Sequence, residues 1–218
     1  MTLTANFNYD LGADIRSRMA SSVKLAKALP LQPDDWIRAA LARLSEAGVD
    51  AVRVELLARD LGVSKGSFYW HFRDRQDLLE KTLTQWEGRE LDLLDLDENA
   101  TNAATRWARI VQATADPGRI QLGASVRSWA RRDERVAQRV AAMERKKAAV
   151  IANVLQDVGF TRAAAEAWSE VALLLCLGWL DRATRDRQFQ LAGRGLGDLL
   201  SEIILAASSR LPSWERAT

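Results

Sequence analysis

Apolar residues recur at helical spacing along nearly the whole 218-residue chain, whereas the alternating pattern typical of strands is scarce. A first helix is predicted to begin at Pro33, because proline suits the first helical position, and to end before Gly48. Its apolar stripe consists of Trp36, Ile37, Ala40, Leu41 and Leu44. A stripe of this width is typical of a helix that packs on a core.

The same spacing predicts eight further helices. They are expected at about 54–61, 64–72, 74–94, 99–114, 118–131, 133–158, 161–182 and 196–210. Polar N-caps are expected at Ser64, Asp74, Asp133 and Thr161, because their side chains can accept from free backbone N–H groups. The pattern therefore predicts an all-α protein of about nine helices.

Composition and charge exclude several classes of protein. The chain has 31 basic and 29 acidic residues, and the net charge of +2 is unlike a polycation or an acidic disordered tail. One cysteine cannot form an internal disulfide, and one histidine cannot build a multi-histidine metal site. The longest apolar run, residues 171–180, is too short to cross a bilayer, and the N-terminus lacks the apolar centre of a signal peptide. We expect a cytoplasmic protein without a membrane span.

Residues 57–69 have the pattern of two helices joined by a tight turn. Ala58 is small enough for the helices to approach, Gly62 permits the turn, and Val63 fills the angle between them. Phe68 and Phe72, four residues apart, are expected to anchor the second helix to the core. The pattern therefore predicts a helix-turn-helix.

The exposed side of the second helix carries hydrogen-bond donors and no carboxylate before Asp74. Its exposed residues are expected to be Ser64, Lys65, Gly66, Ser67, Tyr69, Trp70 and His71. Hydroxyl groups, a glycine that permits close approach and a lysine near the start suit insertion into the major groove of DNA.

From Trp36 to Leu79 the sequence resembles the N-terminal DNA-binding domain of the TetR family of transcriptional regulators. The matching stretches are Ala47-Gly48, Leu57-Ala58, Leu61-Gly62-Val63-Ser64, Lys65-Gly66-Ser67-Phe68-Tyr69, His71-Phe72 and Asp77-Leu78-Leu79. The resemblance implies an N-terminal three-helix helix-turn-helix domain joined to a larger antiparallel helical bundle. It also implies that the bundle binds an effector and forms the dimer.

The resemblance also implies particular DNA contacts. Phosphate contacts are implied for Ser64, Tyr69 and His71, and base contacts for Lys65, Gly66 and Ser67, with Trp70 beside them. Arg75 stands where the family usually has a lysine and is expected to hold a phosphate. Val54 stands where a phosphate-binding Thr or Ser is common, and the neighbouring Arg53 is a candidate to replace it.

We divide the chain into an N-terminal arm (1–31), a DNA-binding domain (32–79) and an effector-binding and dimerisation domain (80–218). The basic residues of the arm either enter a minor groove or stay solvated. The two last helices are expected to pair with those of a second copy. The apolar residues expected at that interface are Leu173, Leu174, Leu177, Leu199, Leu200, Ile203 and Ile204.

The bundle offers candidate ligand-binding residues of two kinds. The apolar candidates for an effector pocket, for each of which taken alone a core position is the favoured alternative, are Trp107, Trp129, Met143, Trp168 and Trp179. Residues 101–150 also hold 11 basic and 4 acidic groups. This basic run is interpreted as a solvated helix face or, alternatively, as a surface that attracts an anionic ligand such as a carboxylate or an acyl-CoA thioester.

The leading hypothesis is a one-component regulator, more a repressor than an activator. It would bind an inverted repeat in double-stranded DNA as a homodimer and be released by a small-molecule effector. The alternative is a helical ligand-binding or scaffold protein that keeps the helix-turn-helix only as a fold element. We expect no enzyme and no cofactor, because the only histidine lies in the helix-turn-helix and no glycine-rich phosphate loop is present.

Overall fold

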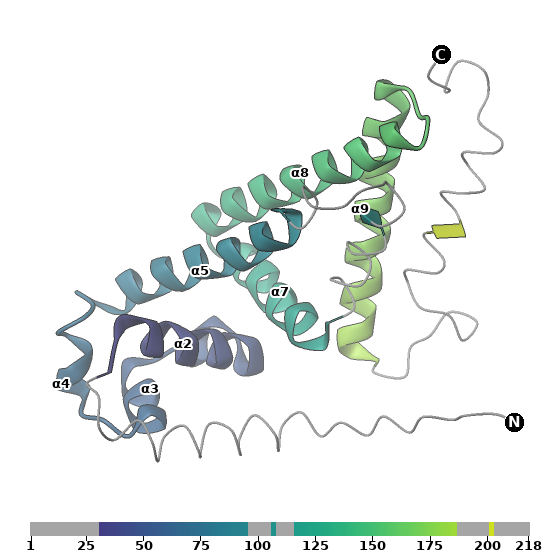
Figure 1. Cartoon of the computed structure of the whole chain (residues 1–218). Coiled ribbons are helices and arrows are strands. Elements are labelled where there is room, and N and C mark those ends of the chain that lie inside the picture. Colours follow the sequence, from purple (N-terminus) through teal and green to yellow (C-terminus); the bar gives the residue numbers. More distant parts are fainter. Residues whose placement is uncertain (1–30, 96–105, 108–115, 187–200, 203–218) are drawn as a thin grey trace, which may run out of the picture.

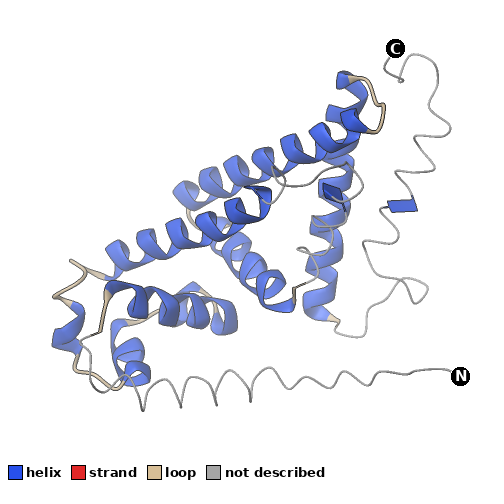
Figure 2. Cartoon of the chain, in the orientation of Figure 1, coloured by secondary structure: helices blue, strands red, loops and turns tan. Residues whose placement is uncertain are grey.

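The computed structural model describes residues 31–95, 106–107, 116–186 and 201–202. Within these ranges all regular structure is helical (Figures 1 and 2). The helices are α2 (Pro33–Ala47), η2 (Val49–Ala51, a 3₁₀ turn), α3 (Val54–Leu61), α4 (Lys65–Phe68), α5 (Arg75–Asp95), α7 (Pro117–Ala130), α8 (Glu134–Asp157) and α9 (Arg162–Arg185).

The predicted all-α class is confirmed, but the described residues contain seven α-helices where about nine were expected. Most of the predicted helices 99–114 and 196–210 lies outside those residues, as do residues 1–30 of the predicted arm 1–31. The helix predicted from Ser64 to Phe72 is shorter than expected. Regular helix ends at Phe68, and the chain continues to Phe72 through hydrogen-bonded turns.

The capping residues define where the helices begin. The carboxylate of Asp133 accepts from the backbone N–H groups of Arg135 and Val136, and the Thr161 hydroxyl accepts from that of Ala164. Asp74 accepts from the N–H of Asp77 at 2.8 Å, so it caps α5 as predicted. Each such bond satisfies a donor that the first helical turn would otherwise leave free.

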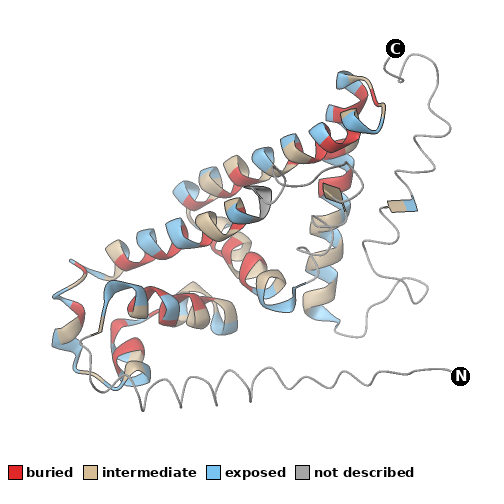
Figure 3. Cartoon of the chain, viewed as in Figure 1, coloured by how far each residue is buried: buried red, intermediate tan, exposed pale blue. Residues whose placement is uncertain are grey.

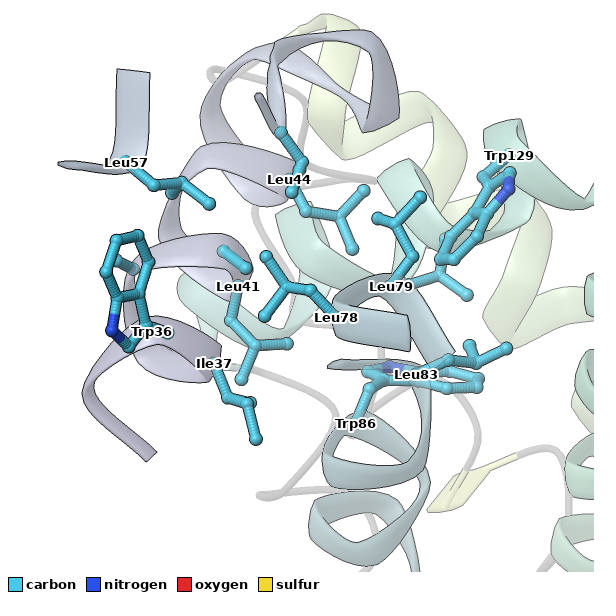
Figure 4. Packing of buried hydrophobic residues seen from close by; sticks show 14 of the residues in the cluster. Trp36, Ile37, Leu41, Leu44, Leu57, Leu78, Leu79, Leu83, Trp86 and Trp129 are labelled. Carbon is cyan, nitrogen blue, oxygen red and sulfur yellow. The ribbon is translucent and has the colours of Figure 1, made fainter. Parts of the chain in front are cut away.

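One apolar core runs without interruption from α2 to α8. Trp36 and Leu44 from α2 belong to the same buried cluster as Leu78 and Leu83 from α5, and the cluster continues to Trp129 of α7 (Figure 4). Each large side chain buried in this way contributes roughly 1.5–3 kcal/mol. Residues 32–79 therefore share an apolar core with the bundle, and the predicted domain division stays a prediction.

A second, smaller apolar cluster joins α8 to α9. Its buried members are Ile151, Ala152, Leu155, Phe160, Ala164, Ala165 and Ala172. Small alanine side chains on α9 let the two long helices approach closely. The buried stripes of the helices face one another, while exposed residues line the outer sides (Figure 3).

Helix α5 begins after the turns that follow α4 and extends into the bundle, where it lies along α8 (Figure 1). Arg139 of α8 pairs with the acidic side of α5. The guanidinium donates from Nε and Nη2 to the two carboxylate oxygens of Glu87, at 2.7 and 2.6 Å, and from Nη2 to the hydroxyl of Thr84 at 2.8 Å. It also pairs with Glu80. The basic run interpreted as a solvated face is therefore partly a contact between helices.

Helix α9 is the one described helix that is long and apolar enough to cross a membrane by length and composition alone. Its most apolar 18-residue window has a mean hydropathy of 1.4, and one third of that window is buried inside the chain. The helix therefore leaves apolar surface that the described residues do not cover.

We predict that Arg139→Gln lowers the free energy of unfolding by about 1–3 kcal/mol, since charged hydrogen bonds at a partly buried position are lost. Arg132→Gln is the matched control, because Arg132 pairs with Asp50 at 3.0 Å where both side chains are about 70% exposed. It should change the free energy by less than about 0.5 kcal/mol. Urea unfolding measures both, and equal effects would contradict the structural role of Arg139.

Candidate nucleic-acid interface

The helix-turn-helix depends on one glycine in a conformation that side chains disfavour. Gly62 ends α3 with φ +68° and ψ 32°, the left-handed region that glycine adopts at little cost. Val63 then donates its N–H to the carbonyl of Ala58 at 3.0 Å and packs against the main core. This confirms the predicted turn between α3 and α4.

Aromatic packing fixes which side of α4 faces solvent. Phe68 is fully buried; its ring stacks on Phe72 at 5.2 Å and meets the edge of Trp36 at 5.3 Å between centroids. Such pairs are worth about 0.5–1.5 kcal/mol beyond the area they bury. Because Phe68 points inward, the residues on either side of it must point away from the core.

The predicted DNA-contacting residues lie on that outer surface. Tyr69 is 57% exposed and Trp70 is 88% exposed, although both are aromatic. Ser64, Lys65 and Gly66 are exposed, whereas Ser67 and His71 are partly buried. Ser64 stands at the N-cap of α4, but its side chain makes no capping hydrogen bond. We call this set, from Ser64 to His71, the reading face.

Lys65 is paired in the free protein. Its Nζ donates to Oε1 of Glu55 on α3, and both side chains are at least half exposed. The hydrogen bond from Lys65 lowers the pKa of Glu55, and the same bond raises the pKa of Lys65. Sequence reasoning missed Glu55, because ten residues and a turn separate it from its partner.

In the folded chain Arg75 binds backbone carbonyls, a role that the sequence did not predict. Its Nε donates to the carbonyl of Val52 at 2.6 Å, and its Nη2 donates to that of Val49 at 2.7 Å. The guanidinium therefore fastens the start of α5 to the segment that follows α2. In the folded chain the group satisfies backbone acceptors, and its phosphate contact stays a prediction.

The other positions near the reading face divide by exposure. Val54 is buried, so its side chain is not available to a phosphate. Arg53 is exposed and donates from Nε to the carbonyl of Asp50 at 3.0 Å, and its DNA contact stays a prediction. Arg73 was missed by sequence reasoning. Its side chain is 86% exposed, at 3.9 Å from the carboxylate of Asp77, and it follows the reading face directly.

The structure divides the candidate effector residues into two groups. Trp129 and Met143 are buried in the main core, whereas Trp107 and Trp168 pack on the α8–α9 cluster. The indole N–H of Trp107 donates to the hydroxyl of Ser201 at 2.9 Å. Trp179 is partly buried on α9. Four of the predicted residues are therefore divided between two apolar clusters, and the effector pocket stays a prediction.

The predicted dimer residues can be followed only on α9. Leu173 is 8% exposed and faces the interior of the chain, so it is corrected to a core residue. Leu174 is 67% exposed, and Leu177 is partly buried. The remaining four predicted residues lie outside the described side chains; they are Leu199, Leu200, Ile203 and Ile204.

Comparisons with known proteins agree with this geometry. Residues 37–82 match the family described as bacterial regulatory proteins, tetR family. Over 50 residues the chain is 50% identical to the tetracycline repressor protein class A from transposon 1721 of Escherichia coli, a match that spans 23% of each chain. The chain thus covers about a quarter of that relative's length.

Solved structures show that the fold extends beyond the matched segment. A transcriptional regulator from Rhodococcus sp. Rha1 superposes with a TM-score of 0.69 at 18% identity, covering 84% of this chain and all of the other. FadR from Bacillus subtilis, solved in complex with stearoyl-CoA, gives 0.57 at 14% identity, covering 83% and 100%. Residues 37–82 are thus similar to the tetR family of bacterial regulatory proteins, and the chain shares the fold of solved transcriptional regulators.

We predict that Arg75→Leu lowers the free energy of unfolding by about 1–3 kcal/mol, because two backbone carbonyls lose a charged donor. Urea unfolding gives this value. Arg73→Leu is the matched control, since the Arg73 side chain is almost fully solvated, and its unfolding curve should match that of the wild type. An unchanged Arg75→Leu curve would show that the guanidinium is free for other partners.

Proposed function

We propose that the chain is a repressor that binds an inverted-repeat operator as a homodimer and is released by a small-molecule effector. The observation that supports it most directly is the inward anchoring of Phe68. It leaves Lys65, Tyr69 and Trp70 exposed on a short segment that follows a tight turn. Exposed aromatic and basic side chains in this arrangement have no packing purpose in the protomer, and they suit a major groove.

Each residue of the reading face has a proposed partner on DNA. Lys65, Gly66 and Ser67 would approach base edges, with Trp70 beside them. Ser64, Tyr69 and His71 would bind phosphates, because hydroxyl and imidazole N–H groups donate to phosphate oxygens. The unused hydroxyl of Ser64 is free to do so. Arg73 joins this set as a further phosphate contact.

The exposed stripe of α9 supports the proposed dimer. Val171 and Leu175, which are 42% and 44% exposed, lie with the more exposed Leu174 at the one-turn spacing of a helix face. Two copies that pack this stripe together would bury apolar surface that the described protomer leaves open, as in a four-helix bundle. A twofold dimer would then present two reading faces roughly one turn of DNA apart.

The position of α5 supports the proposed release. The helix begins directly after the reading face and packs in the bundle against α8. A ligand that favours a shifted position of α5 would move the two reading faces out of register. By linkage, the factor by which the ligand weakens DNA binding is the factor by which DNA weakens ligand binding.

The test is binding of the full chain to DNA that flanks its own gene, measured by fluorescence anisotropy across a salt series. A regulator should prefer one sequence and lose affinity steeply as salt rises. The Lys65→Ala variant should bind that sequence roughly tenfold to a hundredfold more weakly and lose one base preference. Lys146→Ala, an exposed lysine on α8, is the control and should bind normally.

Wild-type protein that binds no sequence in preference to another would refute the proposal. The helix-turn-helix would then be a fold element of a ligand-binding or scaffold protein. Equal loss of affinity in Lys65→Ala and Lys146→Ala would instead show that binding follows total charge.

The Glu55→Gln variant should bind DNA about threefold to tenfold more tightly than the wild type at low salt. The substitution frees Lys65 from its partner and removes a carboxylate that would face phosphates. Asp60→Asn on the same helix is not a suitable control, because Asp60 holds Arg43. Glu46→Gln serves as the control instead, because Glu46 is exposed at the far end of α2. Weaker DNA binding by Glu55→Gln than by the wild type would contradict the argument.

A further inference from the structure

A cluster of charged side chains from α5, α7 and α8 lies inside the bundle. Its centre is Glu90 of α5, which is only 8% exposed. One carboxylate oxygen accepts from Nη2 of Arg119 at 3.2 Å, and the other accepts from Nζ of Lys147. Arg119 also donates to the carbonyl of Arg89 at 2.7 Å. Both oxygens of Glu90 therefore have partners, each on a different helix.

Arg127 lies beside this cluster without a partner of its own. Its guanidinium folds back over Gly123, where an added methyl group would come within 3.2 Å of Nη1. Among the described residues it makes no hydrogen bond and no ion pair. Burial lowers the pKa of Arg127, and the weaker electrostatic attraction to Glu144, Glu90 and Asp181 opposes this shift. Such an arrangement is costly, because a cation removed from water normally needs a paired anion.

The surrounding carboxylates do not balance the cations. Glu90 is shared by two bases already, and Asp181 pairs with Arg185 at 2.7 Å on the outer side of α9. Only Glu144 is left to offset Arg127, and it stands outside ion-pairing distance. Among the described residues, three cations therefore share two carboxylates, so this cluster carries one positive charge in excess.

We infer that this cluster is the head-group site for the effector and that the effector is an organic carboxylate, held by the guanidinium of Arg127. The inference rests on the proposed function and names its ligand class. One carboxylate would supply the missing negative charge, and the planar fork of an arginine matches its two oxygens. The neighbouring buried residues, among them Val126 and Met143, are apolar, so the body of the ligand is apolar as well.

The same geometry gives the ligand a means to act on DNA binding. Glu90 belongs to α5, the helix that follows the reading face, and Lys147 and Arg119 hold it to α8 and α7. A bound carboxylate would compete with Glu90 for these cations. The hold of α7 and α8 on α5 would weaken, and α5 would then be free to shift.

A first experiment needs no ligand. If Arg127 is uncompensated in the free protein, Arg127→Met should raise the melting temperature by about 2–4 °C, because it removes a costly charge. Arg119→Met is the matched control on the same helix and should lower the melting temperature, since it leaves Glu90 with one partner fewer. A lowered melting temperature in Arg127→Met would overturn the inference, because Arg127 would then be a structural cation.

A second experiment identifies the head group. Tryptophan fluorescence of the full chain is titrated with decanoate and with 4-phenylbutyrate, each against its neutral amide. At least one carboxylate should bind saturably and at least tenfold more tightly than its amide. The Arg127→Met variant should lose at least tenfold in that affinity, and Glu90→Gln should gain affinity because a competitor is removed. Binding of neither acid, equal binding of the amides, or unchanged affinity in Arg127→Met would overturn the inference.

DNA binding measured in parallel separates the two levels of the argument. The Arg127→Met variant should bind operator DNA as the wild type does, but decanoate or 4-phenylbutyrate should no longer release it. Failure of the carboxylate experiment with intact DNA binding would reject only the ligand class. Failure of the wild type to bind DNA would reject the proposed function and leave the ligand result to stand alone.

Discussion

The placement of α5 is the constraint on which the rest of the structure depends. Its apolar side, with Leu78 and Leu83, is part of the core that also contains α2 and α7. Its acidic side is held by Arg139 and Lys147 of α8 and by Arg119 of α7. Because both sides of α5 are fixed, the position at which the preceding segment joins it is fixed as well. The reading face is part of that preceding segment.

This arrangement explains the uneven charge along the chain. Residues 81–100 hold 2 basic and 6 acidic groups, and residues 101–150 hold 11 and 4. A basic stretch of this kind would suggest a nucleic-acid surface if it were judged from charge alone. In the folded chain three of these basic residues, Arg119, Arg139 and Lys147, instead pair with acidic side chains of α5. The reading face carries few charges, so recognition there would depend on shape, hydroxyl groups and one lysine.

Sequence reasoning succeeded where local chemistry decides the outcome. The left-handed Gly62, the inward-facing Phe68 and the caps at Asp133 and Thr161 follow from residue type and short spacing, and the structure has each of them. These features depend on neighbours within about five residues. Residue type and short spacing were therefore enough to identify the helix-turn-helix.

Sequence reasoning failed where a charged side chain has several possible partners far away in the sequence. Arg75 fastens carbonyls 23 and 26 residues earlier in the chain, and Arg139 reaches Glu87 across 52 residues. A long flexible cation has many possible partners, and only the packing of the helices selects one. For the same reason Leu173 was assigned to the dimer surface, although a stripe of leucines does not show which side of α9 the protomer covers.

The charges proposed to act in function differ in their energetics from those that hold the fold. Arg119 and Arg139 make several contacts each, so removing either leaves a partly buried carboxylate without its partner. Lys65 has a solvated partner that water can replace, and Arg127 has no hydrogen-bonded or ion-paired partner among the residues that the structure describes. A cation that must bind an incoming anion cannot already be held tightly, because its existing contacts would have to be broken first. The proposed DNA binding requires a cation that is weakly paired, as Lys65 is, and the proposed effector binding requires one without a partner, as Arg127 is among the described residues. The strong ion pairs around Arg139 stabilise the protomer that holds Lys65 and Arg127 in these states.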